Sequence, residues 1–294
     1  MQSHTIDRMN GTKRVFISAD MEGATGVCHR DHLLAGGQDY EKARRWLTGD
    51  VNAAVEGAFD AGATEVVVAD GHATMRNVLL DELHDGARLV TGPAQVRNRP
   101  LGQVTGIEEG RYDAAMLIGY HTRAGTPSGL LAHTWVGSLV RGIRLHGRPA
   151  GEALLNAALF GHYGVPVVLA TGADDFCREA RADLGADLEV VEVKRALGPS
   201  AVIAMTPART RALIRAGAKR AMTREPRAPL VVKRPVLLEV DFHTGEMSRR
   251  ALELGGAASG EAGARYEGGD IVAAVQQVWA GLAHALREEA SFLK

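Results

Sequence analysis

Short runs of apolar, mostly β-branched residues alternate with longer amphipathic segments along the first two thirds of the chain. The apolar runs predict strands at residues 14–19, 65–69, 88–91, 114–119 and 165–170, and a later one at 235–241. Apolar positions spaced three and four residues apart predict helices at 39–61, from 151 onward, at 206–222 and at 270–288. Alternation of this kind is typical of βαβ units and a parallel sheet.

The order of these segments therefore predicts an α/β fold. We expect a mostly parallel sheet flanked by helices, with a smaller C-terminal α/β portion. The larger unit, which also holds the candidate metal ligands described below, is predicted to cover residues 14–200. The smaller portion is predicted to cover residues 201–294, with a Pro/Arg-rich connector at 225–229.

The composition narrows the class of protein further. The 294 residues are 46% hydrophobic and 23% charged, which excludes a disordered, collagen-like or coiled-coil chain. Lys and Arg number 34 against 35 Asp and Glu, so there is no excess charge to bind nucleic acid or a membrane surface, and we expect neither partner. Cys28 and Cys177, far apart in sequence, support neither a disulfide framework nor a thiolate zinc site. The polar N-terminus without an apolar signal segment predicts a cytoplasmic protein.

Potential metal ligands follow three of the predicted strands. Asp20 and Glu22 come after the first strand, His72 after the second, and His121 after the strand at 114–119. Because ligands gather beyond the carboxyl ends of strands in open α/β sheets, we expect these side chains to converge. Two carboxylates so close would repel each other unless a cation lay between them. Carboxylate and imidazole donors together suit zinc or another first-row divalent ion.

Each of these residues also has a structural interpretation. An Asp or His at the end of a strand is often a cap or a turn former, and Glu152 at the start of a helix is favoured by the helix dipole whether or not it binds a metal. His133, downstream of the Gly/Pro loop at 125–129, is placed for general acid or base chemistry beside a metal. The other eight histidines are interpreted as surface or core groups.

Several familiar motifs do not occur in the sequence. It has no phosphate-binding loop and no dinucleotide fingerprint after a predicted strand, so nucleotide binding by those routes is not supported. It also lacks a Gly-x-Ser-x-Gly elbow and a His-Glu-x-x-His helix, which leaves a metal hydrolase of another design.

Five stretches of the sequence resemble, in order and spacing, one known family. They are residues 18–23, 68–72 and 119–121, the loop that reaches His133, and residues 148–152 with Asn156 after them. Together they resemble the bacterial zinc-dependent D-aminopeptidases of the dipeptide-operon type. The resemblance runs from about residue 14 to the C-terminus and is strongest before residue 170.

The resemblance implies two Zn²⁺ ions per chain and assigns the site residues. The implied metal ligands are Asp20, Glu22, His72, His121 and Glu152. Asp20 is implied to bridge the two ions, and His133 to be the catalytic histidine, with its role as acid/base, oxyanion stabiliser or nucleophile left open. Gly71 stands where the family has Ser, and the loop between His121 and His133 is slightly altered, which leaves the substrate preference open.

The expected activity is hydrolysis of short peptides that carry a free N-terminal D-amino acid such as D-Ala, with metal-bound water as the nucleophile. One alternative is a dinuclear hydrolase that acts on L-peptides or other amides, because nothing in the motifs reads chirality. Another is a non-catalytic metal-binding scaffold. The resemblance also implies a ring-shaped homo-oligomer, a decamer, whose active sites face an internal chamber.

Overall fold

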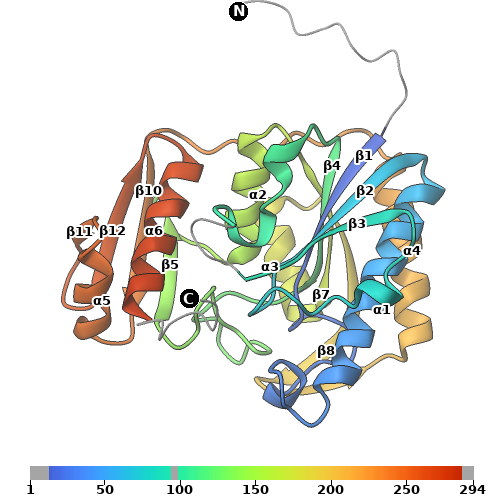
Figure 1. The fold of residues 1–294 in the computed structure, drawn as a ribbon, viewed down its shortest axis with the longest axis horizontal. Coiled ribbons are helices and arrows are strands. Elements are labelled where there is room, and N and C mark those ends of the chain that lie inside the picture. Colours follow the sequence, from blue (N-terminus) through green and yellow to red (C-terminus); the bar gives the residue numbers. More distant parts are fainter. Residues whose placement is uncertain (1–12, 94–98, 287–294) are drawn as a thin grey trace, which may run out of the picture.

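The computed structural model describes residues 13–93 and 99–286, and its centre is a seven-stranded sheet (Figure 1). The strands lie in the order β3-β2-β1-β4-β7-β8-β9. Their bounds are β1 (Lys13–Ala19), β2 (Ala63–Asp70), β3 (Ala87–Val90), β4 (Ala114–Tyr120), β7 (Val167–Ala173), β8 (Glu189–Gly198) and β9 (Ala201–Ala204). All neighbours pair in parallel except β9, which is antiparallel to β8. The predicted α/β fold with a mostly parallel sheet is confirmed.

Helices cover both faces of this sheet. On one face lie α1 (Tyr40–Asp60) and α4 (Pro207–Thr223), and on the other lie α2 (Glu152–His162) and α3 (Asp174–Leu184) (Figure 1). Alternate residues of β1 therefore enter different cores: Val15 and Ile17 pack with α1 and α4, and Phe16 packs with α2. Burial on both faces is the reason that the strands read as continuous apolar runs.

A second, antiparallel sheet of five strands lies beyond α2 (Figure 1). Its order is β11 (Ala257–Ala258), β12 (Gly263–Gly268), β10 (Val236–Phe242), β5 (Val140–Leu145) and β6 (Arg148–Pro149), and it carries α5 (Gly245–Leu252) and α6 (Ile271–Ala285). The sheets cross the expected boundary at residue 200 in both directions, because β5 and β6 join the smaller sheet and β9 joins the larger one. The division into two folding units remains a prediction.

The basic helix predicted at 206–222 is α4, and α1 partly neutralises its charge. Arg215 forms ion pairs with Glu56 and Asp60, both at 2.7 Å. The two helices approach closely at Gly57, where a Cβ atom would lie 2.3 Å from the carbonyl oxygen of Arg215. The face of α4 that carries Arg215 therefore lies against α1.

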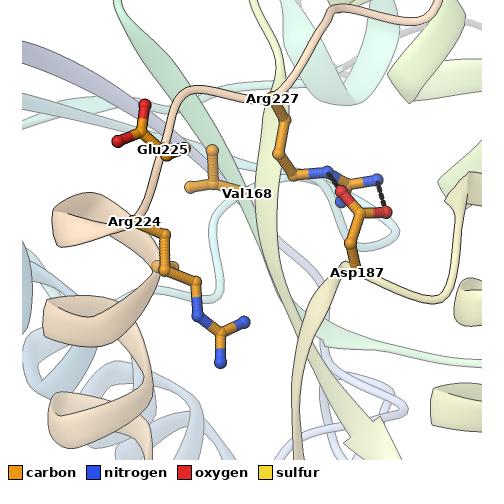
Figure 2. Close-up of a pocket in the computed structure, with 6 residues that line it drawn as sticks. Val168, Asp187, Arg224, Glu225 and Arg227 are labelled. Atoms are coloured by element: carbon orange, nitrogen blue, oxygen red, sulfur yellow. Dashed lines mark hydrogen bonds and ion pairs between the residues drawn. The ribbon is translucent and has the colours of Figure 1, made fainter.

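The remaining elements are short, and the amino edge of the large sheet is hollowed. Single 3-10 turns occur at Arg30–His32, Leu80–Glu82, Gly102–Val104 and Ile107–Glu109. A cavity of about 420 Å³ lies near the starts of β7 and β8 and is lined by Val168, Asp187, Ala221, Arg224, Glu225 and Arg227 (Figure 2). The last predicted helix ends at Ala285, and residues 287–288 of that prediction lie outside the described residues. Within 13–93 and 99–286, every helix is too short or too polar to cross a membrane.

Candidate metal centre

The carboxyl edge of the large sheet brings the predicted ligands together. Asp20 directly follows β1, His72 follows β2, His121 directly follows β4, and Glu152 begins α2. The ends of β1 and β4 approach so closely that a Cβ atom on Gly23 would lie 1.8 Å from the carbonyl oxygen of Tyr120. Glycine at this position therefore lets the two ligand-bearing segments meet.

Asp20, Glu22 and His72 form one half of the centre. Nδ1 of His72 lies 3.0 Å from Oε2 of Glu22 and 3.5 Å from Oδ1 of Asp20. All three side chains are buried, and neither carboxylate residue is more than 3% exposed. A cation between these atoms would be surrounded by two carboxylates and one imidazole.

Asp20, His121 and Glu152 form the other half. Nε2 of His121 lies 3.4 Å from Oδ2 of Asp20 and 3.5 Å from Oε1 of Glu152. Asp20 thus directs one carboxylate oxygen to each half. Asp20 is therefore the carboxylate that both halves share.

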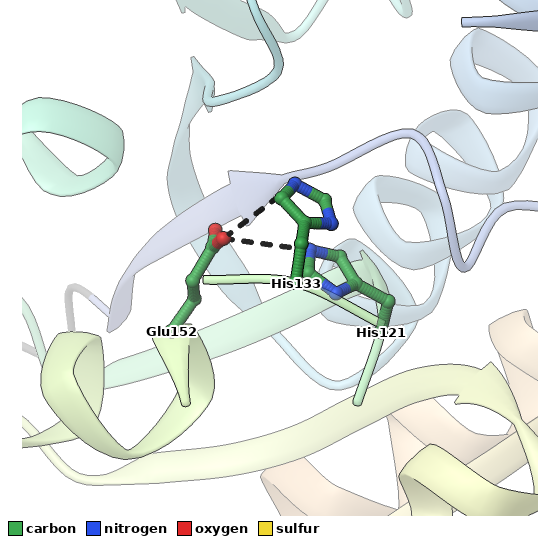
Figure 3. Close-up of side chains that lie close together, drawn as sticks. All are labelled: His121, His133 and Glu152. Atoms are coloured by element: carbon green, nitrogen blue, oxygen red, sulfur yellow. Dashed lines mark ion pairs between the residues drawn. The ribbon is translucent and has the colours of Figure 1, made fainter. Parts of the chain in front are cut away.

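His133 lies between the two halves and is more exposed than the buried ligands. Its Nε2 is 3.8 Å from Oε1 of Glu22 and 4.0 Å from Oε1 of Glu152. Its ring stacks on that of His121, with centroids 4.1 Å apart and planes 4° from parallel (Figure 3). The His133 side chain is 26% exposed, which leaves it accessible to a substrate.

Potential ligand atoms form two overlapping sets within 4.8 Å. One set is Asp20, Glu22 and His121, and the other is His121, His133 and Glu152. His72 falls outside both sets although it directly contacts Glu22, whereas His133 falls inside one. The contact distances and the deep burial of His72 favour it as a ligand, and the exposure of His133 favours a role toward substrate.

The three histidines share one hydrogen-bonding arrangement. Nε2 of His72 lies 2.9 Å from the carbonyl oxygen of Leu33, and Nδ1 of His121 lies 2.9 Å from that of Thr122. Nδ1 of His133 likewise lies 2.9 Å from the carbonyl oxygen of Leu131. Each ring therefore donates one N–H to the backbone and turns its other nitrogen toward carboxylates. In a neutral imidazole that nitrogen carries a lone pair, which can bind a cation but cannot form a hydrogen bond with a carboxylate.

Two buried atoms at the middle of the centre lack hydrogen bonds. Across residues 13–93 and 99–286, neither Oδ2 of Asp20 nor Nε2 of His121 has a hydrogen-bond partner. Buried polar atoms are normally satisfied, so an unsatisfied acceptor beside an unsatisfied imidazole nitrogen calls for an explanation. A bound cation would satisfy both, and the residues present fit such an ion.

The carboxylates and imidazoles of the centre shift one another's pKa values. Burial raises the pKa of Glu22, but the His72 imidazolium outweighs burial and holds that pKa well below its usual range. Burial lowers the pKa of His72, and Glu22 and Asp20 raise it well above the usual value. His121 behaves in the same way, because Glu152 and Asp20 outweigh its burial and raise its pKa. The carboxylates of the centre thus favour positive charge at the positions of the two imidazoles.

Glu152 is held by a buried network that the sequence did not reveal. Its Oε1 accepts a hydrogen bond from the backbone N–H of Trp135 at 2.6 Å, and its Oε2 accepts one from the side-chain amide of Gln103. The Asn156 amide donates to Oε1 of Gln103 at 2.7 Å and to the Tyr120 hydroxyl at 2.8 Å. Gln103 lies in the single 3-10 turn at Gly102–Val104, which is too short to show a periodic pattern, so only its neighbours in space identify its role.

The loop that carries His133 has an unusual backbone. Leu131 and Trp135 on either side of it have positive φ angles of 49° and 56°. Non-glycine residues adopt such angles only where surrounding contacts hold them. Here the Trp135 ring packs against Trp279 of α6, with centroids 4.9 Å apart. The smaller sheet and its helix therefore support the position of His133.

Three comparisons with known proteins agree with this geometry. A model of the peptidase M55 family, described as D-aminopeptidase, matches residues 13–280. The D-aminopeptidase of Bacillus subtilis (strain 168) is 34% identical over 201 residues, which are 68% of this chain and 70% of that protein.

A solved structure extends the match to nearly the whole fold. The structure titled Zn-dependent D-aminopeptidase DppA from Bacillus subtilis, a self-compartmentalizing protease, superposes with a TM-score of 0.87 at 29% identity. The match covers 95% of this chain and 100% of that one. The predicted resemblance is confirmed: the chain is a peptidase that belongs to the M55 family of D-aminopeptidases.

Proposed function

We propose that this chain is a dinuclear zinc aminopeptidase that hydrolyses short peptides with a free N-terminal D-amino acid. The observation that carries the proposal is the shared arrangement of the histidines, each of which aims a second ring nitrogen at buried carboxylates. The related protein of known structure is titled a zinc-dependent D-aminopeptidase, which supports zinc as the metal.

The proposed ligands divide between two ions. Asp20, Glu22 and His72 would hold one ion, and Asp20, His121 and Glu152 the other, with Asp20 shared. When bound, a pair of zinc ions supplies a water of lowered pKa and a Lewis acid for the scissile carbonyl group. The backbone carbonyls of Leu33 and Thr122 orient His72 and His121.

His133 is proposed to act on the substrate and not on the metal. With Nδ1 held by the carbonyl of Leu131, its Nε2 is free to transfer a proton or to stabilise negative charge on the substrate oxygen. Its stacking on His121 fixes the ring plane, so Nε2 remains close to both halves of the centre.

The oligomeric state is part of the same proposal. We propose a homo-oligomeric ring, a decamer, whose sites face an internal chamber, because the structural relative is titled a self-compartmentalizing protease. A chamber would restrict access to short peptides. Size-exclusion chromatography with light scattering should then report a mass several-fold above 31.2 kDa, whereas a monomer would contradict this part of the proposal.

The activity is tested by metal analysis combined with a panel of p-nitroanilides. We expect two zinc ions per chain, hydrolysis of the D-Ala substrate, and little hydrolysis of the L-Ala or N-acetyl-D-Ala substrates. Preference for L-Ala would favour a dinuclear hydrolase of L-peptides. Full metal content without hydrolysis of any substrate would favour a scaffold, and absence of bound metal would overturn the dinuclear centre itself.

A further inference from the structure

Lys194 is a buried lysine that the proposed chemistry does not use. It lies on β8 and is 2% exposed. Its Nζ donates to three backbone carbonyls, those of Glu22 at 2.6 Å, Ala24 at 2.7 Å and Val27 at 2.6 Å. An ammonium group has three N–H donors, so all of them are used on one short segment. In Figure 1 this segment follows β1 and lies beside β8.

Burying a lysine is costly, and the position needs a compensating benefit. A charged ammonium group is almost never fully buried unless it is paired. Here its partners are carbonyl dipoles of residues 22–27, which lie more than 160 positions earlier in the chain. The three bonds hold together a turn that has left β1 and is also tied to β4, because the Gly23 N–H donates to the carbonyl of Gly119 at 2.7 Å.

That turn is held from several elements at once. Asp50 on α1 accepts the Thr25 N–H at 2.8 Å and the Thr25 hydroxyl at 2.9 Å. The same hydroxyl group lies 2.8 Å from that of Thr210 on α4. Residue 22 therefore sits in a segment whose conformation depends on tertiary contacts.

The two carboxylates of this segment depend on Lys194 to different degrees. Asp20 is anchored directly to the sheet, because its N–H donates to the carbonyl of Ile118 at 2.8 Å. The peptide group between Glu22 and Gly23 has two anchors: its carbonyl accepts from Lys194 at 2.6 Å, and its N–H donates to the carbonyl of Gly119 at 2.7 Å. Loss of the ammonium group removes one bond to Glu22 itself and none to Asp20, so it should displace Glu22 more than Asp20.

We propose that Lys194 is a positioning residue for the Glu22 carboxylate and thereby sets the affinity of the metal position formed by Asp20, Glu22 and His72. The inference rests on the proposed dinuclear function. It assigns Lys194 no contact with substrate or metal. Its effect is selective: the position formed by Asp20, His121 and Glu152 should bind its ion with unchanged affinity.

A purely structural lysine would behave differently. Its removal would destabilise the fold and would affect both metal positions equally or neither. The matched control for this possibility is Val193→Ala, because Val193 is the adjacent residue of β8 and is fully buried. This variant creates a small cavity in the same strand but leaves the Lys194 ammonium in place.

The experiment compares Lys194→Met with Val193→Ala by zinc titration in competition with a chromophoric chelator, alongside thermal unfolding of the metal-free proteins. We expect Lys194→Met to bind one ion as the wild type does and the second roughly 10- to 100-fold more weakly, as supporting residues around metal ligands typically cause. Val193→Ala should unfold at a lower temperature but bind both ions within about twofold of the wild type.

Lys194→Gln provides a second variant that remains informative if Lys194→Met does not fold. Its amide keeps two N–H donors. The more weakly bound ion should therefore bind with an affinity between those of the wild type and of Lys194→Met. Equal loss at both positions, or no loss at either, overturns the role of Lys194 while the wild type still binds two ions. A wild type that binds no zinc overturns the proposed function together with this inference.

Discussion

The two edges of the large sheet are both polar, but their charged side chains are paired in different ways. At the amino edge, Arg227 pairs with Asp187 at 2.9 Å (Figure 2), and Arg224 pairs with Glu189 at 2.8 Å. At the carboxyl edge, the imidazole nitrogens of His121 and His133 face Glu152 (Figure 3), and Nε2 of His121 makes no hydrogen bond within residues 13–93 and 99–286.

The difference shows that a cavity does not by itself mark the candidate site. The cavity of about 420 Å³ lies at the amino edge, away from the histidines. Arg224, Arg227 and Asp187 are matched there by partners from the same chain, so they have little left for a ligand. The carboxyl edge concentrates three buried carboxylates, and an excess of that kind needs cations.

The largest expected effect comes from Asp20→Asn, which removes the charge of the shared carboxylate but keeps its shape. Bound zinc should fall from about two ions per chain toward one or none. Since each ion contributes several kcal/mol to transition-state stabilisation, turnover should fall by more than about 10⁴-fold. Metal analysis and turnover are measured together.

Asp113→Asn is the matched control at the opposite edge. Asp113 is exposed and accepts the Arg14 N–H at 2.8 Å, where β1 and β4 begin. This variant should keep its metal and its activity. Full metal content in Asp20→Asn would contradict the bridging role, and loss of metal in both variants would remove the distinction between the two edges.

His133→Ala is expected to have the next largest effect. Turnover should fall by roughly 10²- to 10⁴-fold, the usual range for a positioned acid or base, while the metal content stays at the wild-type value. His162→Ala, at the exposed end of α2, serves as the control and should leave both unchanged. Loss of metal in His133→Ala would make His133 a ligand instead of a proton donor or acceptor.

Asp50 is a buried carboxylate that is not among the proposed metal ligands, and its pKa distinguishes it from them. Burial raises its pKa to about 6 from an ordinary value of 3.8, despite hydrogen bonds from Thr25 and the charges of Lys194 and Arg211. The contribution of Asp50 to folding stability is therefore fully present below pH 3.8 and is lost as the pH rises through about 6.

The comparison of wild type with Asp50→Asn isolates this titration. Between pH 4 and 6.5 the metal-free wild type should lose about 2 kcal/mol of unfolding free energy relative to the variant, because one pKa unit corresponds to about 1.4 kcal/mol and this window spans most of the titration. Urea unfolding at several pH values measures the difference. A difference that does not change with pH would show that Asp50 does not titrate in this range.

Arg224→Met should have the smallest effect and tests the other edge. Arg224 is half exposed, and its partner Glu189 keeps a second ion pair with Arg220 at 2.6 Å. Unfolding free energy should change by less than about 1 kcal/mol, and turnover by less than about twofold. A large loss of turnover would indicate that the cavity at the amino edge contributes to activity.

The sequence predicted those helices and strands of the larger sheet whose apolar residues form a regular pattern within the segment itself. The helix expected at 39–61 is α1, and the strands expected at 65–69 and 114–119 are β2 and β4. All of them are buried on one or both sides, so their patterns are strong. The structure brings the side chains of Asp20, Glu22, His72 and His121 together at one edge, where parallel strands deliver their ends, and Glu152 of α2 joins them.

The sequence did not predict how the smaller sheet is assembled. Strands β5 and β6 come from residues 140–149, and β10, the partner of β5, comes from residues 236–242. Strand β6 pairs locally with β5, but β5 itself pairs with a strand roughly 100 residues further along the chain. Such pairings have no local signal, which is why a single boundary at residue 200 does not describe the two sheets.

The sequence by itself determined the parallel sheet, the ligand types and their order, because apolar periodicity and the chemistry of Asp, Glu and His are local properties. Only the tertiary structure decided which groups support them. Gln103 holds Glu152, and Lys194 binds the segment that carries Glu22, yet neither lies near its partner in sequence. Buried polar groups obtain partners from whatever packs against them, so the packing of the whole fold selects these supporting residues.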